Sequence, residues 1–208
     1  MAAPKRPSWL YLVVGALSLP IVKLLFRLRV RGLEHLPREG GYVLAANHTS
    51  NLDPWPLGLP LWPRRFLRFM GKSELFFWPL GPLIAGCGAF KVRRGESDRE
   101  AIETAEQLCR EGYVVVMFPE GTRRTKGLRK KWQARAHSGA ARIALGAGVP
   151  LVPAAIKGTD RIARLGPLRV AYGPPIVLDD LRDQDVKEAA DVATERLMSA
   201  IRELEASL

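Results

Sequence analysis

The chain contains little of what metal sites and disulfide-stapled folds require. Its 208 residues include only two cysteines and three histidines. Cys87 and Cys109 have no partner at the short spacing of a structural zinc site, and no H-x-x-x-H spacing joins His35, His48 and His137. We therefore expect no bound metal, and two cysteines that stay reduced in a chain facing the cytosol.

Several familiar functional signatures are also missing. There is no G-x-S-x-G turn, so a serine-nucleophile hydrolase lacks its usual motif. There is no G-x-x-x-x-G-K-[ST] loop, which leaves nucleotide hydrolysis without support. No recognised nucleic-acid-binding module appears, so basic charge alone does not indicate such a partner, and we expect no nucleic acid to bind.

The sequence lacks an apolar run long enough to cross a membrane as a helix. A span needs about 20 predominantly apolar residues, whereas the run Trp9–Val22 is shorter and contains Pro20, which would kink or break a helix. Residues 1–28 are therefore expected to form a helical membrane-associating segment, either interfacial or re-entrant, with Trp9 and Tyr11 at headgroup level. A cleaved signal peptide is the competing interpretation, but no A-x-A-like site follows the run.

A histidine and a carboxylate lie five residues apart in the stretch Asn47–Asp53, directly after the apolar, strand-like run Tyr42–Ala46. Imidazole titrates near working pH. A carboxylate on its second ring nitrogen would fix the tautomer and stabilise the imidazolium formed when a hydroxyl is deprotonated. His48 and Asp53 therefore predict acyl or phosphoryl transfer to an alcohol, with a capped turn as the non-catalytic alternative.

A second motif, Phe118–Arg124, follows the β-branched run Tyr113–Met117, which predicts a buried strand. Gly121 lets the backbone approach an anion closely, Thr122 can donate a hydrogen bond, and Arg123 offers a planar fork that matches phosphate oxygens. The motif predicts a phosphate-binding turn. A solvated basic turn after a core strand is the alternative.

Two further segments complete an ordered set of four: Gly88-Ala89-Phe90-Lys91-Val92-Arg93-Arg94-Gly95 and Val149-Pro150-Leu151-Val152-Pro153-Ala154-Ala155-Ile156. In this order and spacing the four segments resemble the 1-acylglycerol-3-phosphate acyltransferase family of glycerolipid synthesis. The resemblance covers residues 29 to 172.

The resemblance implies transfer of an acyl group to the free hydroxyl of lysophosphatidic acid, forming phosphatidic acid. The donor would be acyl-coenzyme A or an acyl carrier protein, with no other cofactor. It implies that His48 is the general base and Asp53 its partner. The positions implied to bind the phosphorylated acceptor are Arg93, Arg94, Glu120, Gly121, Thr122 and Arg123. Those implied on the acyl-donor side are Val149, Pro150, Val152 and Pro153.

Two departures from the family pattern lie near the expected acceptor site. Arg93 stands where the family is often acidic, and residues 135–138 read Arg-Ala-His-Ser where an aromatic residue and a lysine are usual. Another lysophospholipid or a glycolipid therefore stays open as the acceptor. A non-catalytic, basic membrane-binding protein is the alternative from a different functional class.

Positive charge is in excess, with a net charge of +11, and it is unevenly distributed. Residues 122–137 hold seven Lys or Arg and no acid, whereas residues 183–208 hold seven acids and three bases. The basic segment would attract anionic lipid headgroups, the phosphates of coenzyme A or an acidic carrier protein, or it is only a solvated face. We expect a monotopic or peripheral protein on the cytoplasmic face of the cell membrane.

The order of expected elements indicates an α/β fold, a mixed sheet flanked by helices with the motifs on loops at strand ends. The length suits one core, so residues 29–208 are expected to form a single acyltransferase domain. The aromatic-rich region 54–84 is left open among core, acyl channel and membrane contact. Strands are expected near 42–46, 66–70, 113–117, 151–156 and 168–172, and helices near 97–112, 138–145 and 186–204.

Overall fold

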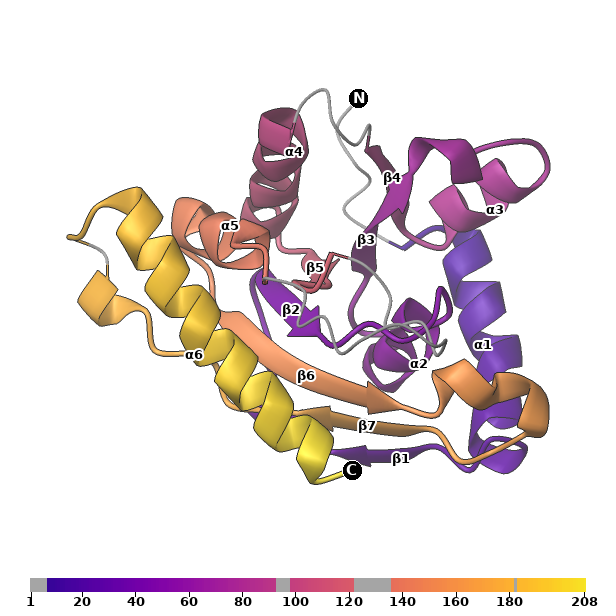
Figure 1. Cartoon of the computed structure of the whole chain (residues 1–208). Coiled ribbons are helices and arrows are strands. Elements are labelled where there is room, and N and C mark those ends of the chain that lie inside the picture. The colour runs from indigo at the N-terminus through magenta and orange to yellow at the C-terminus, as the bar shows by residue number, and fades with distance from the viewer. Residues whose placement is uncertain (1–6, 93–97, 122–135, 182) are drawn as a thin grey trace, which may run out of the picture.

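The protein, described here as a computed structural model, is built on one seven-stranded sheet (Figure 1). The structure describes residues 7–92, 98–121, 136–181 and 183–208. The strands are β1 (Arg29–Arg31), β2 (Tyr42–Ala46), β3 (Leu67–Lys72), β4 (Ala89–Val92), β5 (Val114–Met117), β6 (Leu151–Lys157) and β7 (Arg169–Tyr172). The α-helices are α1 (Trp9–Leu24), α2 (Pro54–Gly58), α3 (Leu80–Gly86), α4 (Asp98–Arg110), α5 (Gly139–Ala147) and α6 (Val186–Ala206).

The sheet is mixed, as predicted, in the order β1-β7-β6-β2-β5-β3-β4. Strands β6, β2, β5, β3 and β4 run parallel to one another, while β7 is antiparallel to β6 and β1 is parallel to β7. The five parallel strands therefore end at one common edge, the carboxyl edge of the sheet. In parallel α/β sheets this edge is where ligands usually bind.

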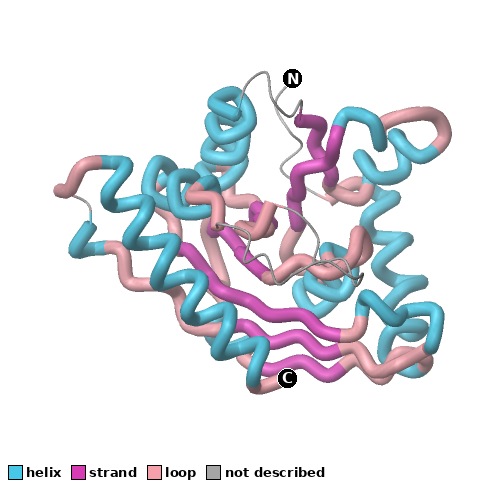
Figure 2. Tube along the Cα trace, in the orientation of Figure 1, coloured by secondary structure: helices cyan, strands magenta, loops and turns pink. Residues whose placement is uncertain are grey.

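Both faces of the central strand β2 are buried, and its side chains alternate between two hydrophobic cores. Val43 and Ala45 face the core beneath α4, α5 and α6. Tyr42, Leu44 and Ala46 face the core beneath α2. Figure 2 shows the resulting layers, with helices on both sides of the strands. Because β2 is fixed from both faces, the turn that follows it starts from a rigid platform.

The amino-terminal helix α1 continues through Pro20 to Leu24, so the helix does not break at that proline. Ser8 caps the helix by accepting a hydrogen bond from the Tyr11 N–H, and its hydroxyl donates to the Gly86 carbonyl at the end of α3. This contact holds α1 beside α3. Among the described residues, none of the helices is both long and apolar enough to span a bilayer.

Tyr11 does not lie where a headgroup contact needs it. Its ring packs edge-on against Phe66 at 4.6 Å between centroids, and its hydroxyl donates to the Arg65 carbonyl. Burial is the main reason that the pKa of Tyr11 is raised to about 12. Trp9, by contrast, is 74% exposed. The headgroup position therefore stays a prediction for Trp9 and is wrong for Tyr11.

The strands expected near residues 42, 66, 113, 151 and 168 and the helices expected near 138 and 186 are all present within two or three residues of their predicted bounds. The predicted helix after residue 97 appears as α4. Its proposed capping residue, Ser97, lies outside the described residues.

Candidate active site

His48 and Asp53 lie on the turn between β2 and α2, at the carboxyl edge of the sheet. The Nδ1 atom of His48 is 2.8 Å from Oδ2 of Asp53. The Asp53 side chain is 0% exposed, and that of His48 is 17% exposed. The predicted pair is therefore formed, with the carboxylate fully inside the protein and the imidazole reaching its surface.

A buried carboxylate is costly unless hydrogen bonds replace its water. The Oδ2 atom of Asp53 accepts from the backbone N–H of Thr49 at 2.7 Å and of Ser50 at 2.9 Å, in addition to His48. The Oδ1 atom accepts from the hydroxyl of Thr159. Burial on its own raises the pKa of Asp53, but the hydrogen bonds from His48, Ser50, Thr159 and Thr49 outweigh it, so the pKa lies below its ordinary value.

The ionised Asp53 is an acceptor only, so the hydrogen shared with His48 must be carried by Nδ1 of the imidazole. This leaves the lone pair of neutral His48 on Nε2. The imidazole ring also stacks on Phe118, with 4.1 Å between centroids and 20° between planes. One side of the ring is thus fixed by a carboxylate and one face by an aromatic residue, which is the arrangement a positioned general base requires.

The Phe118–Arg124 motif contacts the Asn47–Asp53 motif through the stacked rings of Phe118 and His48. Phe118 directly follows β5, which pairs in parallel with β2, so both motifs leave the sheet at the same edge. Glu120 is buried, and Gly121 adopts a positive φ of 65° that favours glycine. A side chain at Gly121 would also meet His137, whose Cδ2 lies 2.5 Å from the ideal Cβ position. His137 is held there by its backbone N–H, which donates to the Pro119 carbonyl at 2.8 Å.

Four of the predicted acceptor-binding residues, Arg93, Arg94, Thr122 and Arg123, lie outside the described residues. The strands that lead into them, β4 and β5, end at the same edge of the sheet as β2. Among the described residues, no three His, Cys, Asp or Glu side chains gather as a metal site would require.

The segment predicted to lie on the acyl-donor side does not lie at the edge of the sheet that carries His48. In the β2–β6 register Leu151 is opposite Val43, so Val149 and Pro150 lie at the amino edge, the opposite edge from His48. Val152 is buried in the core beneath α2. The structure does not bring these residues to His48, and their role stays a prediction.

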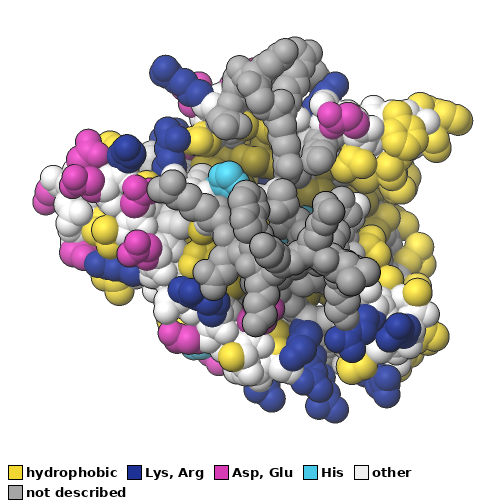
Figure 3. Space-filling model, in the orientation of Figure 1, with side chains coloured by type: hydrophobic (Ala, Val, Ile, Leu, Met, Phe, Trp, Pro, Cys, Tyr) yellow, Lys and Arg dark blue, Asp and Glu magenta, His cyan; other side chains and the backbone are white. Residues whose placement is uncertain are grey.

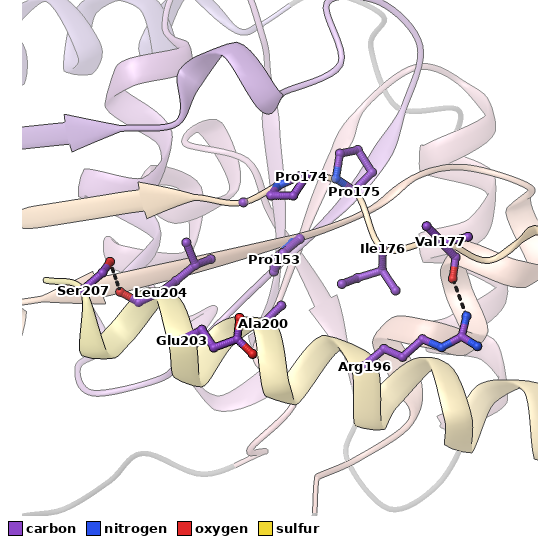
Figure 4. A pocket seen from close by; sticks show the side chains of 11 residues that line it. Pro153, Pro174, Pro175, Ile176, Val177, Arg196, Ala200, Glu203, Leu204 and Ser207 are labelled. Carbon is purple, nitrogen blue, oxygen red and sulfur yellow. Dashed lines mark hydrogen bonds between the residues drawn. The ribbon is translucent and has the colours of Figure 1, made fainter.

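Pro153 lines a separate cavity of ≈ 540 Å³ between α6 and residues 173–177 (Figure 4). Most of its wall is apolar, formed by prolines and aliphatic side chains such as Ile176 and Leu204. Arg196 lies at its rim, where its guanidinium donates to the Val177 carbonyl and to Asp180. This cavity is on the α6 side of the sheet.

Two residues with a role in the site were not assigned one from the sequence. The buried amide of Asn47 donates to the Ile156 carbonyl at 3.0 Å and accepts from the Ile156 N–H at 2.8 Å, which ties the end of β2 to the end of β6. Thr159 follows β6 and hydrogen-bonds Asp53. The position of Thr159 just past β6 could have indicated this role, because the carboxyl ends of parallel strands lie at one edge of the sheet.

Comparison with known proteins places this geometry in a defined class. The family model described as Acyltransferase matches residues 27–157. The chain belongs to the acyltransferase family. The match includes His48, Asp53 and the Phe118 motif, and it ends two residues before Thr159.

Individual relatives agree on a narrower description. The chain is 32% identical to a Bacillus subtilis protein named 1-acyl-sn-glycerol-3-phosphate acyltransferase, over 86% of this chain and 89% of that one. It is 29% identical to the human 1-acyl-sn-glycerol-3-phosphate acyltransferase alpha, over 86% of this chain and 65% of the human one. These names confirm the resemblance drawn from the four sequence segments.

A solved structure is similar over nearly the whole chain. The crystal structure of the 1-acyl-sn-glycerophosphate (LPA) acyltransferase PlsC from Thermotoga maritima superposes with a TM-score of 0.64 and 25% identity. The match covers 93% of this chain and 78% of that one. The mixed α/β sheet flanked by helices is thus the fold of a solved acyltransferase.

Proposed function

We propose that the protein transfers an acyl group from an acyl thioester to the free hydroxyl of 1-acyl-sn-glycerol 3-phosphate, forming phosphatidic acid. The observation that carries the proposal is the 2.8 Å contact between His48 and a fully buried, multiply hydrogen-bonded Asp53. The names of the relatives at 32% and 29% identity support the acceptor.

The proposed reaction is a direct transfer with His48 as general base. Nε2 takes the proton of the acceptor hydroxyl while the hydroxyl oxygen attacks the thioester carbonyl carbon, and Asp53 stabilises the imidazolium that forms. When the tetrahedral adduct collapses, the carbon–sulfur bond breaks and the imidazolium returns its proton to the leaving thiolate. The free thiol and the ester are the products, and no covalent acyl-enzyme is needed.

The acceptor phosphate would be held by the cationic residues that follow β4 and β5, namely Arg93, Arg94 and Arg123, with Gly121 and Thr122 as hydrogen-bond donors. The position of those strand ends beside β2 supports this assignment, because all three leave the sheet at one edge. Glu120 is buried next to the turn and would order these residues or contact the glycerol. A positioned phosphate converts an encounter into an oriented attack.

The donor is proposed to be acyl-coenzyme A or an acyl carrier protein. Both present a phosphopantetheine thioester, and both carry negative charge. The basic stretch at residues 122–137, with seven Lys or Arg and no acid, suits either one.

The lipid acceptor requires access to a membrane, and the protein has a surface suited to it. Figure 3 shows apolar side chains gathered over α3 and α1 along one side of the molecule, with Lys and Arg side chains gathered below them. Trp78, just before α3, is 84% exposed. The apolar face, as we name it, consists of Trp9, Leu12, Val13, Leu17, Ile21 and Leu24 of α1 and Phe77, Trp78 and Leu83 at α3.

Large exposed aromatic and aliphatic side chains beside cations are typical of proteins that lie at an anionic bilayer surface. Lys23 and Arg27, at and just beyond the end of α1, are exposed and continue the apolar face with positive charge. We propose that residues 1–28 and the turn before α3 dock together on the cytoplasmic face of the cell membrane, as a peripheral or monotopic contact.

A second candidate keeps the chemistry and changes the acceptor to another lysophospholipid or a glycolipid. The position of His137 against Gly121 favours keeping it, since an imidazole lies on the turn expected to hold the acceptor phosphate. The experiment is thiol release with product analysis, using purified protein, lysophosphatidic acid in mixed micelles, and acyl-coenzyme A or acyl-carrier protein as donor.

Thiol release together with phosphatidic acid supports the proposal, and the donor that supports turnover identifies the thioester. Thiol release only with other lysophospholipids or glycolipids would move the assignment to the second candidate. No transfer with either donor and any of these acceptors would contradict both.

A further inference from the structure

Among the residues that the structure describes, Thr159 approaches Asp53 from a different part of the chain than every other hydrogen-bond donor to that carboxylate. The other donors, His48, Thr49 and Ser50, all belong to the turn that carries Asp53 itself. Thr159 is 106 residues away in sequence, at the start of the short helix after β6. Although its side chain is polar, Thr159 is 2% exposed.

The two carboxylate oxygens are not equally supported. Oδ2 accepts three hydrogen bonds of 2.7 to 2.9 Å from the local turn. Among the described residues, only two hydroxyls lie within hydrogen-bonding distance of Oδ1, that of Thr159 and, at a longer 3.3 Å, that of Thr49. Without Thr159, a fully buried carboxylate oxygen would keep a single long hydrogen bond.

The hydroxyl hydrogens can be assigned because each hydroxyl has only one. The Oγ1 atoms of Thr49 and Thr159 are 2.8 Å apart. Thr159 donates its hydrogen to Asp53, so its oxygen accepts the hydrogen of Thr49, which takes this shorter contact in place of the 3.3 Å contact with Oδ1. The result is a directed chain from Thr49 through Thr159 to Oδ1, which opposes rotation of the carboxylate away from His48.

The backbone around Thr159 fixes the hydroxyl in place. Asn47 makes two hydrogen bonds to the backbone of Ile156, so the end of β6 is clamped to the end of β2. Gly158 then turns the chain with a φ of 102°, and a side chain there would lie 2.5 Å from the Pro167 carbonyl oxygen. The pairing of β6 with β2 and the turn at Gly158 therefore position Thr159 next to Asp53.

We propose that Thr159 is a positioning residue for the acyl transfer, holding Oδ1 of Asp53 so that Oδ2 stays on Nδ1 of His48. This inference rests on the proposed function. A hydrogen bond to a charged group contributes enough to change a rate by about 10- to 100-fold when that group orients the base. The loss should fall on kcat, with KM for either substrate little changed, because Thr159 acts through Asp53 and His48.

The test compares Thr159→Val, which keeps the shape and removes the hydroxyl, with Thr159→Ser, which keeps the hydroxyl. Thr194→Val is the matched control, because Thr194 is also buried and its hydroxyl donates to the Ala190 carbonyl within α6. We expect Thr159→Val to lower kcat by about 10- to 100-fold, Thr159→Ser to restore most of it, and Thr194→Val to leave kcat unchanged.

Equal kcat for Thr159→Val and the wild type would overturn the inference, as would equal losses in the Val and Ser variants or a matching loss in Thr194→Val. If Thr159→Val does not fold, Thr159→Ala provides the hydroxyl-free variant for the same comparison. An inactive wild type would instead contradict the proposed function, so the two failures are distinguishable.

Discussion

Asp53 and Trp78 are opposite exceptions to the usual rule of protein burial. Asp53 is a charged side chain with no exposure, and Trp78 is a large aromatic side chain with 84% exposure. Every oxygen of Asp53 is matched by donors within the chain. Trp78 has most of its side chain in solvent, as does Trp9 on the same apolar face.

The difference separates two kinds of functional surface. A buried charge that is fully hydrogen-bonded serves the internal geometry of a site, and its removal should damage chemistry and stability together. An exposed apolar side chain contributes little to folding, and its removal should damage only the contact with a partner. Mutations in the two regions should therefore have separable effects.

The largest effect is expected for His48→Ala. General acid–base catalysis by one positioned side chain contributes about 10²- to 10⁴-fold, so kcat for acyl transfer should fall by that factor while binding to vesicles is unchanged. The measurement is thiol release in parallel with vesicle sedimentation. His35→Ala is the control, because His35 follows the edge strand β1, three strands away from β2 in the sheet, where it contacts the Tyr172 carbonyl and not Asp53. Robust transfer by His48→Ala would contradict the general-base assignment.

Asp53→Asn should destabilise the fold by about 1–3 kcal/mol at pH 7, because an amide cannot accept all the hydrogen bonds that the carboxylate accepts. The pKa of Asp53 lies below its ordinary value, so the ionised form favours the folded state. This stabilisation is fully present above the unfolded pKa, about 3.9, and is lost as pH falls through the folded pKa.

The measurement is urea unfolding of wild type and Asp53→Asn at pH 7 and at pH 3. The difference in the free energy of unfolding should be larger at pH 7. An equal or larger difference at pH 3 would show that the Asp53 charge does not stabilise the fold.

Trp78→Ala should weaken binding to anionic vesicles by about tenfold, the loss expected for one large apolar side chain that leaves water on docking. Its melting temperature should not change, because the side chain is exposed in the free protein. Val186→Ala is the control, an exposed apolar residue at the start of α6, off the apolar face. Equal vesicle binding by Trp78→Ala and the wild type would remove Trp78 from the docking surface.

The smallest effect is expected for Ser50→Ala. Ser50 supports Asp53 through its backbone N–H, which alanine keeps, while its own hydroxyl only accepts from the Leu52 N–H at an exposed turn. The change in kcat/KM should stay below about threefold, as for most substitutions that remove no buried contact. A loss comparable to that of Thr159→Val would mean that the hydroxyl of residue 50 has a role of its own.

The sequence was sufficient to predict the contact between His48 and Asp53 and the central strands. The run Tyr42–Ala46 is apolar throughout, which suits a strand buried on both faces, and His48 and Asp53 follow it at a short spacing. The short strand β1 could not be predicted in the same way. Arg29 and Arg31 of β1 are exposed at one edge of the sheet, and the strand has only three residues.

The contacts that depend on tertiary structure were also beyond local patterns. Tyrosine is a residue type that is common at membrane interfaces. Only the packing of the Tyr11 ring on Phe66 shows that this side chain packs against the core. Thr159 reaches Asp53 because β6 pairs in parallel with β2, a pairing between segments more than 100 residues apart. The same register places Val149 at the far edge from His48, which its sequence motif does not reveal.

The most direct test of the central claim is the tautomer of His48, measured by ¹⁵N NMR of histidine-labelled protein at a pH where the ring is neutral. Asp53 accepts from Nδ1, so we expect the hydrogen on Nδ1 and the lone pair on Nε2, with the Nδ1–H signal lost or altered in Asp53→Asn. A neutral His48 with its hydrogen on Nε2 would contradict the account, because Nε2 would then have no lone pair with which to take the proton of the acceptor hydroxyl.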